Sequence, residues 1–281
     1  MATTDVWAEW LRNRRSGGSA EQRRVLLEQL APVRDKILDD AEVGPGDVVL
    51  DVGCGDGLVG LGALERGAQV IFSDVSQPCL DDCRAVAGER ARYHLASATD
   101  LGDVEADVVT TRSVLIYVKD KQRAFDEFFR VLRPGGRLSI FEPINRFGCE
   151  ERRRTFGGFD MSGLEDVIAK LDARYDDAAD EGAMIDFDER DLLALAERAG
   201  FAELRLQYTA EVGGDVLRIA RDWDVFVNTA PNPLAPSLAE VMEDALTDAE
   251  RDRLVAALRP QVEAGAARSR FADAYLLARK R

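Results

Sequence analysis

Residues 48–65 show the first clear change in the spacing of apolar side chains along this chain. Residues 48–52 read Val-Val-Leu-Asp-Val, an almost unbroken apolar run of the kind found in a strand that is covered on both faces. From Leu58 onward the apolar residues return at helical spacing. The pattern predicts a strand over 48–52 and a helix that begins at Leu58, with a short turn between them.

The same unit of a strand followed by a helix recurs along the chain. The helix before residues 133–136 carries Phe125, Phe128, Phe129 and Leu132 on one face, which indicates packing into a core. Further strands are expected over 69–73, 91–95, 107–111, 137–142, 201–212 and 271–277. This alternation is typical of α/β proteins. We therefore predict a Rossmann-like, doubly wound and mostly parallel seven-stranded sheet with helical cap insertions.

A glycine-rich turn joins the first strand to the first helix. Gly53, Gly55 and Gly57 permit positive φ angles and let a ligand approach the backbone closely. The next strand ends at Asp74, an acid placed to bind ribose hydroxyls. The turn lacks the Gly-Lys-Ser/Thr ending of a P-loop, and Asp56 would repel a pyrophosphate but tolerates a cationic ligand. The turn predicts a site for an adenosine-bearing ligand, with a nicotinamide oxidoreductase as the rival fold.

The chain resembles the class I S-adenosylmethionine-dependent methyltransferases at three places. They are residues 49–57, which read Val-Leu-Asp-Val-Gly-Cys-Gly-Asp-Gly, then Asp74, and then residues 130–136, which read Arg-Val-Leu-Arg-Pro-Gly-Gly. The resemblance implies S-adenosylmethionine as the cofactor and methyl transfer as the reaction. It also implies that the cofactor contacts Asp51, Gly53, Cys54, Gly55, Asp74 and Val75.

In that family the loop after the third strand binds the adenine. Ser97 stands where the family usually has an acid, so we expect Ala98 and Thr99 to share this contact with Ser97. Arg112 directly follows the fourth strand, and ligands of open parallel sheets bind outside the carboxyl ends of strands. Arg112 is therefore also expected to lie near the cofactor.

The resemblance also gives roles to the segments outside the sheet. Residues 1–42 contain two helical stretches, with Pro32 interrupting or kinking the second, and correspond to an N-terminal helical lid over the cofactor. Trp10 of this lid, with Trp7, either stacks on the sulfonium or adenine or packs into the core. The methyltransferase domain is expected to span 43–281, with cap insertions at about 147–185 and 214–268 that build an acceptor lid.

Methyl transfer from a sulfonium is a direct displacement, so such an enzyme mainly aligns the reacting atoms and excludes water. We predict Glu142 and Arg112 as catalytic residues, although an ion pair from Glu142 to Arg112 or Arg146 is an equal alternative. Arg112, Arg146 and the run 152–154 offer clamps for a carboxylate-bearing acceptor. His94, the single histidine, is expected to be structural, and no metal site is predicted.

Composition narrows the partners. The 281 residues carry a formal net charge of −15, which argues against a nucleic-acid substrate. No apolar run approaches a membrane span, so a cytoplasmic protein without a membrane partner is expected. Cys54, Cys79, Cys83 and Cys149 are expected to be core thiols. We predict methyl transfer to an oxygen, nitrogen or carbon atom of a small molecule. The alternatives are an arsenite methyltransferase that uses cysteine thiolates and an S-adenosylmethionine-binding module that does not methylate.

Overall fold

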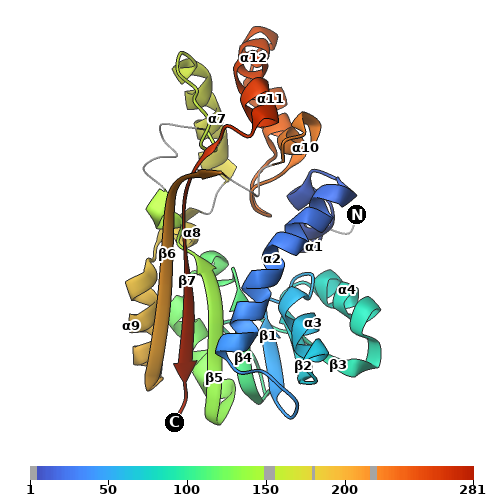
Figure 1. The fold of residues 1–281 in the computed structure, drawn as a ribbon, viewed down its shortest axis with the longest axis vertical. Coiled ribbons are helices and arrows are strands. Elements are labelled where there is room, and N and C mark those ends of the chain that lie inside the picture. Colours follow the sequence, from blue (N-terminus) through green and yellow to red (C-terminus); the bar gives the residue numbers. More distant parts are fainter. Residues whose placement is uncertain (1–4, 149–155, 179–180, 216–219) are drawn as a thin grey trace. The chain divides into compact units, whose positions relative to one another are not determined.

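The sheet contains seven strands in the order β3-β2-β1-β4-β5-β7-β6 (Figure 1). The computed structural model describes residues 5–148, 156–178, 181–215 and 220–281. Strands β1 to β5 pair in parallel, and β7 runs antiparallel to β5. The strands are β1 (Val48–Val52), β2 (Gln69–Asp74), β3 (Ala91–Leu95), β4 (Ala106–Arg112), β5 (Leu132–Pro143), β6 (Glu203–Asp215) and β7 (Arg268–Arg279). The predicted Rossmann-like, mostly parallel seven-stranded sheet is confirmed.

Helices flank the sheet on both sides, because side chains alternate between its two faces along each strand. On one face Val49, Phe72 and Phe141 share a hydrophobic cluster with buried residues of α2, α3 and α4. The helices α5 and α9 pack against each other on the other side (Figure 1). These helices are α2 (Ala20–Asp40), α3 (Leu58–Glu65), α4 (Gln77–Ala87), α5 (Lys121–Val131) and α9 (Glu189–Ala199).

Side-chain caps fix the ends of these helices. Ser76 Oγ accepts a hydrogen bond from Cys79 N at the start of α4. Asp188 begins α9 with a capping box in which Asp191 returns the hydrogen bond, and Gly200 ends that helix with a φ of +106°. Local residues therefore set these boundaries, with polar side chains at the helix starts and a glycine at the end of α9.

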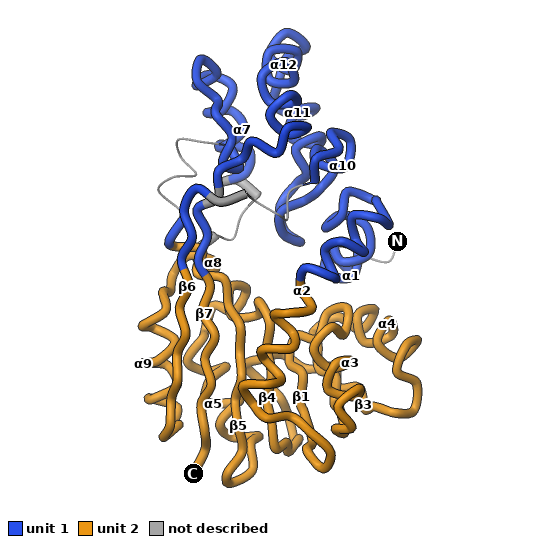
Figure 2. Tube along the Cα trace, in the orientation of Figure 1, with its two compact units in different colours: residues 1–29, 147–181, 210–272 blue, residues 30–146, 182–209, 273–281 orange. Residues whose placement is uncertain are grey.

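Contacts divide the chain into two compact units, each built from three separate segments (Figure 2). The sheet unit comprises residues 30–146, 182–209 and 273–281, and the helical unit comprises residues 1–29, 147–181 and 210–272. Phe159, Trp223 and Leu258 belong to a hydrophobic cluster within the helical unit. The principal helices of that unit are α1 (Val6–Arg12), α7 (Glu165–Ala178), α10 (Trp223–Asn228), α11 (Leu238–Ala245) and α12 (Asp248–Ala264).

Some boundaries differ from the sequence prediction. The helix α2 runs through Pro32 without interruption, because Leu30, Val33 and Ile37 beside it are buried and their packing outweighs one lost hydrogen bond. Leu132 begins β5 instead of ending the preceding helix, because it pairs with Ala106 of β4. The proposed lid of residues 1–42 is divided between the two units. Within the described residues, no helix is both long and apolar enough to cross a membrane.

Candidate active site

The glycine turn after β1 has the backbone conformation expected from its sequence. Gly53, Gly55 and Gly57 have φ angles of +64°, +54° and +81°, a region that residues with a side chain rarely adopt. A Cβ atom on Gly53 would lie 2.5 Å from Val114 Cγ2, so glycine is also required there for space. The turn therefore presents backbone groups where other residues would present side chains.

Asp74 joins this turn to the end of β2. Its Oδ2 accepts a hydrogen bond of 2.9 Å from Gly55 N, and its Oδ1 accepts one of 2.9 Å from Ser76 N. Val75, which follows the acid, is 54% exposed and offers an apolar surface beside it. The Asp74 carboxylate thus brings together the predicted cofactor residues Gly55, Asp74 and Val75 by accepting hydrogen bonds from two main-chain N–H groups.

Asp51 is buried in β1 below the turn. Its Oδ2 accepts a hydrogen bond of 2.8 Å from Gly60 N in α3, and its Oδ1 accepts one of 3.1 Å from Thr110 Oγ1 in β4. Burial raises the pKa of the Asp51 carboxyl to about 7, against the opposing effect of these two hydrogen bonds. Asp51 therefore ties α3 to the point where the order of the strands reverses, which is where ligands of such sheets bind.

The loop after β3 is held in a compact turn by its own hydroxyl groups. Ser97 Oγ lies 2.9 Å from Thr99 Oγ1 and accepts a hydrogen bond of 3.2 Å from Thr99 N. Ala98 between them is buried. Ala96 N donates a hydrogen bond of 3.0 Å to Asp74 O, which connects this loop to the end of β2. The three residues expected to receive the adenine therefore come directly after a residue that is hydrogen-bonded to Asp74.

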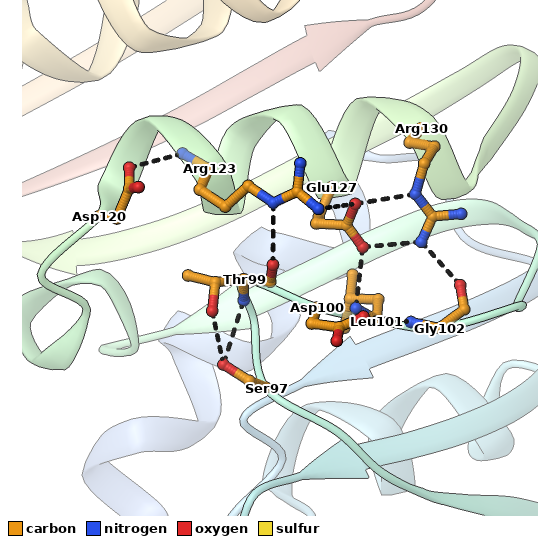
Figure 3. Close-up of polar contacts among 9 residues, drawn as sticks. All are labelled: Ser97, Thr99, Asp100, Leu101, Gly102, Asp120, Arg123, Glu127 and Arg130. Carbon is orange, nitrogen blue, oxygen red and sulfur yellow. Dashed lines mark hydrogen bonds and ion pairs between the residues drawn. The ribbon is translucent and has the colours of Figure 1, made fainter.

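Helix α5 holds this loop through charged side chains that the sequence analysis missed (Figure 3). Arg123 Nε donates a hydrogen bond to Thr99 O, and Glu127 Oε2 accepts one from Leu101 N. Arg130 donates to both oxygens of Glu127. The spacing of these charges along the helix, by four and then three residues, was the available signal. The same spacing is common on solvated helix faces, so by itself it does not indicate a site.

Glu142, predicted as a catalytic residue, holds the loop after β4. The residue is fully buried, and its Oε1 accepts hydrogen bonds of 2.9 Å from Val114 N and 3.0 Å from Leu115 N. Its Oε2 accepts a longer one, of 3.4 Å, from Ile116 N. Burial raises the pKa of Glu142 to about 7, although these three hydrogen bonds and the charge of Arg112 lower it. The carboxylate is thus engaged by backbone N–H groups, and its catalytic role stays a prediction.

The arginines expected to receive an anionic acceptor have different surroundings. Arg112 ends β4 half-buried, and its charge lowers the pKa of two buried carboxyl groups of the site. The side chain of Arg146 is 60% exposed, and its Nη1 lies 4.0 Å from Asp188 Oδ2. The run 152–154 lies outside the described residues. Arg112 and Arg146 are therefore the two members of the predicted clamp that the structure describes.

The described cysteines are buried thiols, as expected. Cys54 Sγ lies 3.9 Å from Cys83 Sγ, and Cys83 Sγ donates to Gly55 O at 3.5 Å. The hydrogen bond with Cys83, together with burial, raises the pKa of the Cys54 thiol, which favours the protonated form. Cys79 is also buried, and Cys149 lies outside the described residues. The described thiols therefore give no support to an arsenite site, which needs accessible thiolates.

Trp10 packs within the helical unit. Its Nε1 donates a hydrogen bond of 2.9 Å to Ala230 O, and the Arg15 guanidinium carbon lies 5.2 Å from its ring centre. The sequence left open whether Trp10 stacks on the cofactor or packs against the protein. The structure shows that it packs against residues of its own unit. The half-buried Trp7 lies on the same helix, α1.

Comparison with known proteins shows similarity over the first part of the sheet unit. A family model described as "Methyltransferase domain" matches residues 50–140. An uncharacterized protein of Mycobacterium tuberculosis is 36% identical over 118 residues, covering 40% of this chain and 43% of that protein. The ubiquinone biosynthesis O-methyltransferase of Hahella chejuensis is 33% identical over 133 residues, covering 45% and 56%. The tRNA 5-carboxymethoxyuridine methyltransferase of Escherichia coli is 29% identical over 165 residues, covering 56% and 61%. The chain thus spans about half the length of the curated relatives that it matches.

Solved structures share the fold over most of the chain. The [4+2]-cyclase SpnF matches with a TM-score of 0.52 and 20% identity, covering 90% of this chain and 81% of that one. A geranyl diphosphate methyltransferase in complex with SAM matches with a TM-score of 0.51 and 17% identity, covering 95% and 94%. At these identities the likeness concerns the fold alone. Residues 50–140 therefore correspond to a methyltransferase domain, in agreement with the family and the cofactor predicted from the sequence motifs.

Proposed function

We propose that this protein transfers a methyl group from S-adenosylmethionine to a small-molecule acceptor. The observation that carries the proposal is the hydrogen bond from Gly55 N to Asp74 Oδ2, because it joins the glycine turn to the acid at the end of β2. Both residues lie within the stretch that matches the methyltransferase family model. The Hahella relative is named as an O-methyltransferase of ubiquinone biosynthesis, which supports a small-molecule acceptor.

The residues around this hydrogen bond fit the proposed cofactor. The backbone of Gly53, Cys54 and Gly55 suits close contact with the amino-acid part, because the two glycines, at positive φ angles, carry no side chain that would block the approach. Asp74 suits the ribose hydroxyls, and the exposed Val75 suits the apolar face of the base. When bound, S-adenosylmethionine supplies an electrophilic methyl carbon on a sulfonium leaving group.

The loop after β3 is proposed to complete the base site. Ser97 and Thr99 carry hydroxyl groups that bond one another, and Ala98 packs inward between them. Their backbone and hydroxyl groups would offer the donors and acceptors that an adenine edge needs. Asp51 is proposed to act below the turn, by holding Gly60 of α3 in place.

Glu142 is proposed to contribute by positioning and Arg112 by direct contact. The Glu142 carboxylate fixes Val114 N and Leu115 N, and therefore the path of the chain just after Arg112. A direct displacement depends on alignment more than on proton transfer, so a fixed loop and one cation can be sufficient. General-base catalysis by Glu142 is the alternative, since a pKa of about 7 suits that role.

The acceptor is proposed to be a small molecule that bears a carboxylate. The net charge of −15 disfavours a nucleic-acid backbone, whereas guanidinium groups such as those of Arg112 and Arg146 bind carboxylates well. RNA is the competing substrate class, because one relative is named as a tRNA methyltransferase.

Calorimetry and a product assay test this function. We expect S-adenosylmethionine to bind, and S-adenosylhomocysteine to form when a metabolite fraction is added. Product that forms only with total tRNA would overturn the small-molecule acceptor, and the absence of cofactor binding would overturn the function itself. Arg146→Ala should raise the KM for the acceptor and leave cofactor affinity unchanged. If the KM does not change, the acceptor does not use Arg146.

A further inference from the structure

We infer that Arg123, Glu127 and Arg130 on α5 set the affinity of the protein for the base of S-adenosylmethionine, by holding the loop after β3 in its binding conformation (Figure 3). The inference rests on the proposed function, because that function assigns the base to this loop. These three residues are positioning residues, since their side chains contact the loop and one another. We call them the α5 clamp.

The α5 clamp binds the loop at three main-chain atoms. The contacts are those of Arg123 Nε with Thr99 O at 3.2 Å, of Glu127 Oε2 with Leu101 N at 2.8 Å, and of Arg130 Nη2 with Gly102 O at 2.7 Å (Figure 3). Because all three contacts involve the backbone, they fix the path of the loop independently of its side chains. Two of the contacts occupy carbonyl oxygens and one occupies an N–H group, so the loop cannot rotate at one residue without losing a partner.

Glu127 is the centre of the α5 clamp. The residue is 2% exposed, and Arg130 donates to its two oxygens at 2.8 Å from Nε and 2.7 Å from Nη2. The Arg130 hydrogen bonds hold the pKa of Glu127 below its ordinary value, against the effect of burial. The carboxylate therefore stays ionised near neutral pH. An ion pair with one exposed partner, here Arg130, adds little stability. Its orientation towards the backbone of the loop therefore calls for another explanation.

The same loop is held from the side of the sheet. His94 Nε2 lies 2.8 Å from Leu101 O, so Leu101 is bonded through its carbonyl to β3 and through its N–H to α5. Ala96 N, at the start of the loop, donates to Asp74 O. The loop is thus fixed on one side by the strands that carry the ribose acid and on the other by the α5 clamp. Loosening the clamp should affect the base and spare the ribose.

Glu127→Gln tests this division within the ligand. Glutamine keeps the shape of the side chain, but its neutral amide replaces the carboxylate with which Arg130 forms an ion pair and two hydrogen bonds. We expect the Kd for S-adenosylhomocysteine to rise about tenfold, the effect of one disrupted charged hydrogen bond. S-ribosylhomocysteine has the same thioether and ribose but lacks the base. Its Kd should change by less than about twofold, because nothing of it reaches the loop.

Arg130→Gln is the second variant, and Arg133→Gln is its matched control. Arg133 Nη1 bonds Asp107 Oδ2 at 3.0 Å, and its side-chain exposure of 42% is close to the 47% of Arg130. Arg130→Gln should reproduce the selective loss for S-adenosylhomocysteine, and Arg133→Gln should not. Hydrogen exchange in the ligand-free protein gives an independent readout. The Leu101 amide should exchange faster in Glu127→Gln and at the wild-type rate in Arg133→Gln.

The outcomes separate the inference from the proposed function. The inference would be overturned if either α5-clamp variant lost affinity equally for S-adenosylhomocysteine and S-ribosylhomocysteine, or lost none for S-adenosylhomocysteine. Because the wild-type protein still binds its ligands in these cases, the proposed function would stand. An unchanged exchange rate at Leu101 would overturn it as well. If the wild-type protein binds neither S-adenosylmethionine nor S-adenosylhomocysteine, the proposed function fails instead.

Discussion

The sheet unit and the helical unit differ in how they use buried charge. Among the described residues, the buried carboxylates all belong to the sheet unit; they are Asp51, Asp74, Glu127 and Glu142. Each accepts at least one hydrogen bond from a backbone N–H group. The core cluster of the helical unit is apolar, and an ion pair such as that between Arg253 and Asp166 lies at the surface. The sheet unit therefore uses buried carboxyl groups to fix loops and a helix, whereas the helical unit is held together mainly by apolar packing.

Phe159→Ala should produce the largest change, and it should be a change in stability. Phe159 is fully buried and meets the Phe226 ring edge-on at a centroid distance of 5.7 Å. Removing the ring should lower the free energy of unfolding by about 4 kcal/mol, as measured by urea titration. The Kd for S-adenosylmethionine should stay within about twofold. Leu234→Ala, at a residue that is 41% exposed, is the control. A large loss of cofactor affinity in Phe159→Ala would break the contrast between the units.

Asp74→Asn should show the reverse pattern. The amide retains an acceptor for Gly55 N or Ser76 N but loses the charge that both N–H groups face, and it offers the ribose a weaker acceptor. We expect cofactor affinity to fall about 100-fold by calorimetry, and the free energy of unfolding to fall by only about 1 to 2 kcal/mol, less than in Phe159→Ala. Asp81→Asn, on the exposed part of α4, should bind normally. Normal cofactor binding by Asp74→Asn would remove this residue from the site.

Glu142→Gln should change how stability depends on pH. Burial raises the pKa of Glu142 from 4.5 to about 7, so the folded protein holds a proton over this range that the unfolded chain has released. The stabilisation from this group is complete below pH 4.5 and is lost as the pH rises through 7, at about 1.4 kcal/mol per pH unit. Urea titrations from pH 5 to pH 7 should therefore show a shallower fall in Glu142→Gln.

Asp51→Asn provides the parallel measurement, because burial raises the pKa of Asp51 to the same value of about 7. Each variant should remove about 1.4 kcal/mol per pH unit from the slope, and the double variant should be nearly flat over this range. A double variant with the wild-type slope would mean that other groups control the dependence.

Arg253→Gln should have the smallest effect. Arg253 bonds Asp166 at 2.9 Å, but the two side chains are 47% and 55% exposed, so solvent screens the pair. We expect no resolvable change in the thermal midpoint or in cofactor affinity. A clear loss of stability would show that the helical unit also depends on charge.

Local signals in the sequence were sufficient for most of the sheet unit. The run 48–52, the glycine turn and Asp74 are neighbours in sequence that remain neighbours in space, so a periodicity and a motif could place them. Leu132 was misplaced because its pairing with Ala106 is a long-range contact that outweighs the helical pattern before it. For a similar reason Pro32 does not interrupt α2, which was one of the two alternatives, since buried neighbours hold the helix through it.

The roles of the polar site residues were harder to predict. Glu142 is separated in sequence by 26 to 28 residues from the N–H groups that donate hydrogen bonds to it. Glu127 is separated by 26 residues from Leu101, whose N–H group donates to it. A sequence shows which side chains are acidic, but the partners of a buried carboxylate depend on which loops the sheet brings beside it. The catalytic roles of Glu142 and Arg112 therefore stay predictions, as do the individual cofactor contacts.

The position of β7 has a consequence for the order of folding. In the sheet it lies between β5 and β6, although the chain makes it after both. During synthesis on a ribosome, β6 therefore emerges before the strand that connects it to the rest of the sheet. Both β5 and β6 must keep an edge unpaired until β7 arrives, and exposed strand edges are prone to association with other chains. Completion of the sheet at this edge is therefore expected to be a late and slow event, because it joins residues far apart in sequence.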